Sequence, residues 1–233
     1  MKAVILAGGK GTRLLEKTKV IPKPMIKIGN KPIIWHIIKL LSAQGIDDFI
    51  ICSGYKSNII EQFFKNKKNI KVINTGLKTQ TAKRISMIKE YVKEDSNFLM
   101  TYGDGLANIN LKDLIDLHLK KKKLATVTAV LPPARFGSII IKNNLVKSFD
   151  EKPTNYKNVI NGGFFILNKK IFRALNLGKR DEMWEQSPMK RLTKISQLAV
   201  YTHKDFWHPM DTLRDNIHLN KLWKNNTAPW KIW

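Results

Sequence analysis

Short apolar runs alternate with amphipathic segments along the first half of the chain, and this order is compatible with few folds. The apolar runs predict strands at Lys2–Ala7, Phe49–Cys52, Ile70–Ile73, Phe98–Tyr102 and Ala125–Leu131. Segments with helical periodicity lie between them, at Pro32–Gln44, Lys56–Phe64, Thr81–Lys93 and Leu111–Lys121. This alternation favours an α/β fold with a mostly parallel central sheet and helices on both faces.

The pattern changes after Pro132-Pro133. Two apolar runs flank Asn143-Asn144 and predict a hairpin of Ser138–Ile141 with Leu145–Phe149. Further strands are expected at Gly162–Leu167 and Leu198–His203, and helices near Lys169–Leu175, Pro188–Ile195 and Thr212–Trp223. Because no linker or repeat interrupts the chain, we expect one domain over residues 1–233. Its halves, 1–131 and 132–233, share the sheet, and the second half is smaller and richer in β-structure.

The chain is strongly basic, with 42 Lys and Arg against 18 Asp and Glu, a net charge of +24. Such a charge indicates either an anionic partner or lysines scattered over solvated faces. Only residues 120–123 form a dense lysine run, at the end of a predicted helix, where cations suit the helix dipole. Basic and aromatic residues do not alternate as in single-strand binders, so we do not expect a nucleic-acid partner.

The sequence also bears on the cellular compartment. Cys52 is the only cysteine, which excludes an internal disulfide and favours the cytoplasm. No apolar stretch reaches the roughly 20 residues that span a bilayer, so no membrane association is expected. Met1 leads almost directly into a predicted strand and a glycine-rich loop, which argues against a signal peptide.

The first twenty-five residues contain a glycine-rich loop and two cations, Arg13 and Lys23, that are candidates for phosphate binding. The predicted first strand leads into Gly8-Gly9-Lys10-Gly11-Thr12-Arg13-Leu14, and Pro22-Lys23-Pro24-Met25 follows. Glycines let backbone N–H groups approach phosphate oxygens, and Arg13 and Lys23 can neutralise charge that develops on a phosphate during transfer. The loop is neither a Walker loop nor a dinucleotide fingerprint. It indicates nucleoside triphosphate chemistry; the alternative is a tight turn without a ligand.

Two aspartates are candidate metal ligands. Asp104 lies between Gly103 and Gly105 at the carboxyl end of a predicted strand, the edge where ligands bind in open parallel sheets. A carboxylate beside a phosphate loop suits Mg²⁺, although an Asp-Gly turn would have the same sequence. Asp211 precedes the last predicted helix, so it is either the N-cap of that helix or a second metal ligand.

The second half adds candidate contacts to an acceptor. Glu151 and Lys152 follow a predicted strand, and side chains of these types bind sugar hydroxyls and phosphate; a surface ion pair is the alternative. Gly162 and Gly163 open the next strand and indicate either close backbone approach by a ligand or a bulge. The histidines show no metal-binding spacing.

These motifs together resemble the sugar-phosphate nucleotidylyltransferase family, in particular its branch that uses CTP and glucose 1-phosphate. The resemblance covers nearly the whole chain. It is carried by the glycine loop with residues 22–25, and by Lys31–His36, Tyr102–Gly105, Arg135–Gly137, Asn161–Phe165, Trp184–Gln186, Phe206–Asp215 and Ala228–Trp233. It implies a Rossmann-like fold and Mg²⁺-dependent transfer of a cytidylyl group from CTP to glucose 1-phosphate, which releases pyrophosphate. A homo-oligomer is compatible with it.

The resemblance also implies roles for individual residues. Those of the nucleotide site would be Leu6, Ala7, Gly8, Gly9, Lys10, Gly11, Thr12, Arg13, Lys23, Thr79, Arg84 and Gly103. Among them, Arg13 and Lys23 would be catalytic, because they stabilise the α-phosphate and the departing pyrophosphate. Asp104 and Asp211 would share one Mg²⁺, while Glu151, Lys152 and Gly163 would bind the sugar phosphate.

Two departures from the family pattern keep alternatives open. The family shows Thr-Gly-Gly-Arg in its base-binding segment, where this chain has Thr81-Ala82-Lys83-Arg84. The region between Phe64 and Ile70 is shorter than in the CTP-using branch. One alternative is therefore the same reaction with another nucleotide, or with another sugar or polyol phosphate. A second is a non-catalytic module that binds sugar nucleotides or nucleic acid.

Overall fold

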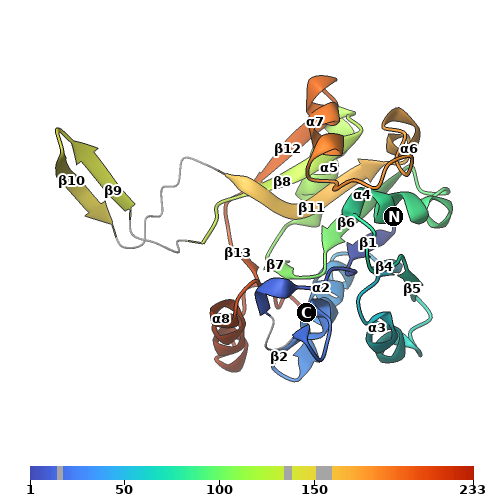
Figure 1. Ribbon diagram of the computed structural model, residues 1–233, viewed down its shortest axis with the longest axis horizontal. Coiled ribbons are helices and arrows are strands. Elements are labelled where there is room, and N and C mark those ends of the chain that lie inside the picture. The colour runs from blue at the N-terminus through green and yellow to red at the C-terminus, as the bar shows by residue number, and fades with distance from the viewer. Residues whose placement is uncertain (15–17, 134–137, 151–158) are drawn as a thin grey trace.

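The computed structural model describes residues 1–14, 18–133, 138–150 and 159–233, and a seven-stranded sheet forms its centre (Figure 1). The strand order is β12 (Leu198–His203), β8 (Ala125–Val130), β11 (Ile160–Asn168), β6 (Asn97–Tyr102), β1 (Ala3–Leu6), β4 (Phe49–Ser53) and β5 (Ile70–Asn74). Of the described strands of this sheet, β11 alone runs antiparallel to its neighbours. The predicted α/β fold with a mostly parallel sheet is therefore confirmed.

Helices cover both faces of the sheet. They are α2 (Ile33–Ser42), α3 (Ser57–Phe64), α4 (Thr81–Met87), α5 (Leu111–Lys121), α6 (Ile171–Ala174), α7 (Ser187–Lys194) and α8 (Leu213–Lys224). In β1, Ala3 and Ile5 belong to one buried cluster with residues of α2, α3 and α5, whereas Val4 and Leu6 belong to a second with residues of α4, α6 and α7. A strand with both faces buried is expected to be apolar throughout, as β1 is.

The helix boundaries follow local chemistry. Helix α5 has the predicted bounds, because Asn110 caps its first turn and Lys122 ends it in a left-handed conformation. The predicted helix Thr81–Lys93 is wrong in length. Helix α4 ends at Met87, and a short 3-10 turn (Lys89–Tyr91) follows. Ile88 and Val92, on either side of this turn, stay buried. The apolar spacing that predicted one long helix is therefore present although the helix ends at Met87.

The two halves of the chain meet in the sheet, since β8 of the first half pairs with both β11 and β12 of the second. The predicted hairpin is present as β9 (Ser138–Lys142) and β10 (Leu145–Asp150), with positive φ at Asn143 and Asn144. It forms a separate two-stranded sheet that stands apart from the central one (Figure 1).

Two short ladders were not predicted. Strand β2 (Lys27–Ile28) pairs with β3 (Lys31–Pro32), and β7 (Gly105–Ala107) pairs with β13 (Trp207–Pro209). The second ladder joins segments about a hundred residues apart and lies at the carboxyl end of β6. It therefore positions the residues on either side of it, Asp104 and Asp211.

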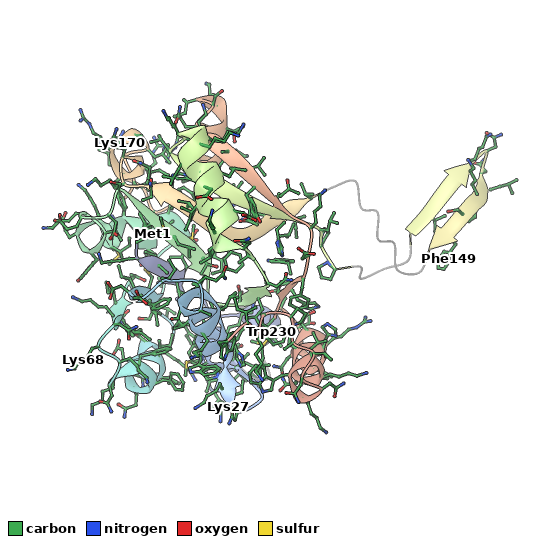
Figure 2. All side chains as sticks on the ribbon, turned by 180° about the vertical axis from the view of Figure 1, so that it is seen from behind. Met1, Lys27, Lys68, Phe149, Lys170 and Trp230 are labelled. Atoms are coloured by element: carbon green, nitrogen blue, oxygen red, sulfur yellow. The ribbon has the colours of Figure 1, made fainter. Side chains whose placement is uncertain are left out.

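The chain's C-terminal residues return to α2, where the Trp230 ring is fully buried beside His36. Figure 2 shows Lys27, Lys68 and Lys170 at three separate edges of the molecule, so these basic side chains are spread rather than gathered. Among the helices that the structure describes, none combines the length and the hydropathy of a bilayer-crossing segment.

Candidate active site

A cavity of about 540 Å³ opens at the carboxyl ends of β1 and β6. Its wall includes most of the sequence-predicted nucleotide and metal residues, namely Leu6, Ala7, Gly8, Gly9, Gly11, Thr12, Lys23, Thr79, Arg84, Gly103, Asp104 and Asp211. It also includes Leu77, Lys78 and Met183, which the sequence did not single out, and Thr81 and Tyr102, which the sequence placed in family motifs without a role of their own. The structure thus brings together side chains from both halves of the chain.

The other predicted residues are placed differently. Lys10 is an exposed residue of the loop and is not among the described residues of the cavity wall. The backbone of Arg13 lies in a 3-10 turn, η1 (Thr12–Leu14), and its side chain falls outside the description. Glu151 and Lys152 lie outside the described residues. Gly163 borders a smaller adjoining cavity of about 40 Å³.

The buried side chain of Arg84 supports the glycine loop through hydrogen bonds. Its side chain, 4% exposed, donates hydrogen bonds to the carbonyl oxygens of Ser53 (2.9 Å) and Gly8 (3.2 Å) and to the Thr75 hydroxyl. Burial of the guanidinium lowers the pKa of Arg84. A Cβ atom on Gly8 would lie 2.0 Å from Nη1 of Arg84, so the loop can rest on this side chain only because residue 8 is glycine.

Lys23 lies between the two aspartates. It begins the 3-10 turn η2 (Lys23–Met25), and its Nζ is 2.6 Å from both Asp104 Oδ2 and Asp211 Oδ1. Burial lowers the pKa of Lys23, but attraction to Asp104 and Asp211 outweighs it, so the pKa is raised overall. Lys23 is therefore held as a cation although its side chain is only 11% exposed.

The β7–β13 ladder explains why the two carboxylates meet. Gly105 pairs with Pro209, and the Met210 N–H donates to the Asp104 carbonyl oxygen at 2.8 Å. The interpretation of Asp211 as a helix N-cap is wrong, because Thr212 caps α8 in a capping box with Asp215. The Asp211 N–H donates to the Asp215 carboxylate at 2.9 Å, which fixes the backbone of Asp211 and directs its side chain to Lys23.

The donor set suits a divalent ion that also binds phosphate. Within the described residues, no three His, Cys, Asp or Glu side chains gather into a complete metal site. Asp104 and Asp211 supply two carboxylates around one cationic position, and Mg²⁺ in proteins commonly takes one or two carboxylates with phosphate and water. The residues present therefore fit this ion when a triphosphate supplies further oxygens.

A second cavity, of about 370 Å³, adjoins the first. Its wall consists of Tyr102, Asp104, Pro132, Pro133, Ile160, Trp207, Pro209 and Asp211. Tyr102, Asp104 and Asp211 line both cavities. The carboxylate pair thus lies at the boundary between two spaces, each large enough for a small molecule, as a group-transfer site requires.

The altered segment Thr81–Arg84 does not crowd the larger cavity. Ala82 is buried in the second core cluster, and Lys83 Nζ donates to the Gly178 carbonyl oxygen at 2.6 Å. The described cavity wall includes Thr81 and Arg84 but neither residue between them. The substitution of two glycines by Ala and Lys is accommodated on the side away from the cavity.

Comparison with known proteins agrees with this geometry. Residues 2–223 match the family model described as nucleotidyl transferase. The chain belongs to the nucleotidyl transferase family. Relatives in this family share the whole chain: the glucose-1-phosphate cytidylyltransferase of Salmonella typhimurium is 45% identical over the full length of both proteins.

More distant members of the nucleotidyl transferase family differ in the nucleotide and the sugar that their names give. A D-glycero-alpha-D-manno-heptose 1-phosphate guanylyltransferase of Aneurinibacillus thermoaerophilus is 34% identical over 77% of this chain and 80% of its own length. Among solved structures, HddC from Yersinia pseudotuberculosis is 26% identical, covers 95% of this chain and 99% of its own, and has a TM-score of 0.73. HddC has also been solved in complex with GMP-PN.

Proposed function

We propose that this nucleotidyl transferase is a glucose-1-phosphate cytidylyltransferase, which transfers a cytidylyl group from CTP to glucose 1-phosphate and releases pyrophosphate. The observation that carries the proposal is the cluster of Lys23, Asp104 and Asp211 at the boundary of two cavities. It occurs in a chain that matches cytidylyltransferases from end to end. As expected from the sequence, we place the enzyme in the cytoplasm.

The cavity of about 540 Å³ suits CTP, and the cavity of about 370 Å³ suits the sugar phosphate. A phosphate oxygen of glucose 1-phosphate then attacks the α-phosphorus of CTP, the bond to the β-phosphate oxygen breaks, and pyrophosphate leaves. The attacking oxygen is already anionic, so no side chain has to remove a proton. The rate depends on holding the two substrates in line and on neutralising charge, as in other phosphoryl transfers.

Each part of the site has a role in this scheme. The backbone amides of the loop at Gly8–Gly11 would bind the triphosphate, and Arg84 keeps that loop in place. Lys23 supplies a positive charge to phosphate oxygens, and we assign the same role to Arg13 from the family resemblance. Glu151, Lys152 and Gly163 are proposed, also from the resemblance, to contact the acceptor.

The metal that we propose is Mg²⁺, held by Asp104 and Asp211. Bound there, it would neutralise charge on the triphosphate and on the departing pyrophosphate. The support is chemical: two carboxylates lie at one cationic position beside a loop suited to phosphate.

A substrate panel tests the proposal. Purified protein is mixed with each common ribonucleoside triphosphate and a set of sugar 1-phosphates in the presence of Mg²⁺, and pyrophosphate release is measured. We expect CTP with glucose 1-phosphate to give the highest kcat/KM. A preference for GTP, or for a heptose or mannose phosphate, would overturn the cytidylyltransferase assignment. No release with any pair would favour the non-catalytic module, against which the intact cluster of Lys23, Asp104 and Asp211 argues.

A further inference from the structure

The N-terminus of helix α4 is capped by a distant part of the chain. The Gln80 N–H donates to Asp181 Oδ1 at 2.8 Å, and the Ala82 N–H donates to the Glu182 carbonyl oxygen at 3.1 Å. The first amides of a helix have no partner within the helix, so they need acceptors from elsewhere. Here Asp181 and Glu182, about a hundred positions later, provide them, and they thereby fix a helix whose first residue, Thr81, lines the larger cavity.

Glu185 extends this contact to the other side of the site. One of its carboxylate oxygens accepts a hydrogen bond from the Thr81 hydroxyl at 2.8 Å, and the other accepts one from the Tyr102 hydroxyl. The Trp184 N–H in turn donates to the Thr81 hydroxyl oxygen at 2.7 Å. The Trp184 ring is fully buried and meets Phe165 edge to face, which anchors the segment to the core.

Tyr102 is the residue through which Glu185 reaches both substrates. Tyr102 lines the larger cavity and also the second, 370 Å³ cavity. Gly163 packs against the ring so closely that a Cβ atom there would lie 2.6 Å from it. The Tyr102 hydroxyl donates a hydrogen bond to the Glu185 carboxylate, which fixes the side chain at the boundary of the two cavities.

We propose that Glu185 is a positioning residue that couples the two cavities. Among the described residues it belongs to neither cavity wall, yet it binds Thr81 on the nucleotide side and Tyr102 on the boundary. A ligand that fixes one of these side chains orders the other through the shared carboxylate. By thermodynamic reciprocity, each substrate then raises the affinity for the other. The identity of the two substrates rests on the proposed function.

The test measures this coupling by calorimetry. Glucose 1-phosphate is titrated into the Mg²⁺-loaded protein with and without a CTP analogue whose α,β-bridge cannot be cleaved. In the parent, the analogue should raise the affinity for glucose 1-phosphate by about 5- to 150-fold, the usual range of such coupling. Glu185→Gln keeps the shape but offers one acceptor oxygen instead of two, so we expect it to lose most of this increase. The affinity for each ligand alone should change by less than about threefold.

Glu182→Gln is the matched control. It makes the same charge change in the same segment, but the Glu182 carboxylate pairs with Arg191 at 2.5 Å rather than with a residue of either cavity wall. We expect it to keep the coupling. Tyr102→Phe removes only the hydroxyl and should reduce the coupling as Glu185→Gln does, with no further loss in the double variant; it also serves if Glu185→Gln does not fold.

The inference is overturned if the parent shows no coupling, if Glu185→Gln and Tyr102→Phe keep it, or if Glu182→Gln loses it equally. Should the substrate panel identify another pair of substrates, the same titration is made with that pair. Failure of the substrate assignment and failure of the coupling therefore give different results.

Discussion

Gly8→Ala is the sharpest test of how the loop is supported. The new Cβ would lie 2.0 Å from Nη1 and 2.2 Å from Cζ of Arg84, far inside van der Waals contact. The guanidinium cannot move away without giving up its bonds to Ser53, Thr75 and Gly8, because it is buried among them. The substitution therefore forces either the loop or the cation out of place.

The cost can be worked out from these contacts. Overpacking a buried position costs about 1–3 kcal/mol, and each hydrogen bond made by a charged group contributes about 1.5–3 kcal/mol. If relief of the clash breaks one or two of these bonds, the free energy of unfolding falls by about 3 kcal/mol or more. For a domain of this size, that corresponds to a Tm lower by about 6–12 °C.

Gly9→Ala is the natural control, because no described atom lies within 4 Å of a Cβ atom there. Thermal and urea unfolding of both variants should show Gly8→Ala strongly destabilised and Gly9→Ala within about 0.5 kcal/mol of the parent. A parent-like Tm for Gly8→Ala, or equal destabilisation by both substitutions, would refute the packing of the loop on Arg84.

Three further predictions concern charged or titrating side chains. Lys23→Met should lower pyrophosphate release by about 10²-fold or more, as loss of an oxyanion-stabilising group does; release equal to the parent would exclude the role given to Lys23. Electron paramagnetic resonance with Mn²⁺ in place of Mg²⁺ should detect ion binding in the parent and lose it in Asp104→Asn, and unchanged binding would exclude the metal site. Burial lowers the pKa of His36 below its ordinary 6.5, so as pH falls the unfolded chain takes up a proton that the folded chain does not. The free energy of unfolding should therefore fall as pH drops below 6.5, less steeply in His36→Gln, and urea titrations with the same slope for both proteins would contradict this.

Much of the fold could be predicted from the sequence, because the central strands are buried on both faces and read as continuous apolar runs. Strand β1 and helix α5 are examples: one is apolar throughout, and the other is bounded by a side-chain cap and a left-handed residue. Helix α4 was predicted too long, because the 3-10 turn after it preserves the same apolar spacing.

The candidate site was harder to predict from the sequence. The glycine loop and Asp104 follow strands whose ends are visible in the sequence. The position of Asp211 depends on β7 and β13, which have three residues each and are too short for any periodicity. Glu185 shows no sign of its role either, since its partners are far away in the sequence. The sequence showed only that Trp184–Gln186 belongs to the family motifs, and the contacts of Glu185 with Tyr102 and Thr81 became visible in the structure.

The pairing of β7 with β13 also bears on how the protein is made. Lys23 and Asp104 leave the ribosome early, within a segment that carries the core of the sheet. Asp211 joins them only after Trp207–Pro209 has emerged and docked against β7. While residues beyond 206 are still in the ribosomal tunnel, Asp211 cannot yet lie beside Lys23. The two aspartates that we propose as Mg²⁺ ligands can therefore come together only after both halves of the molecule have been synthesised.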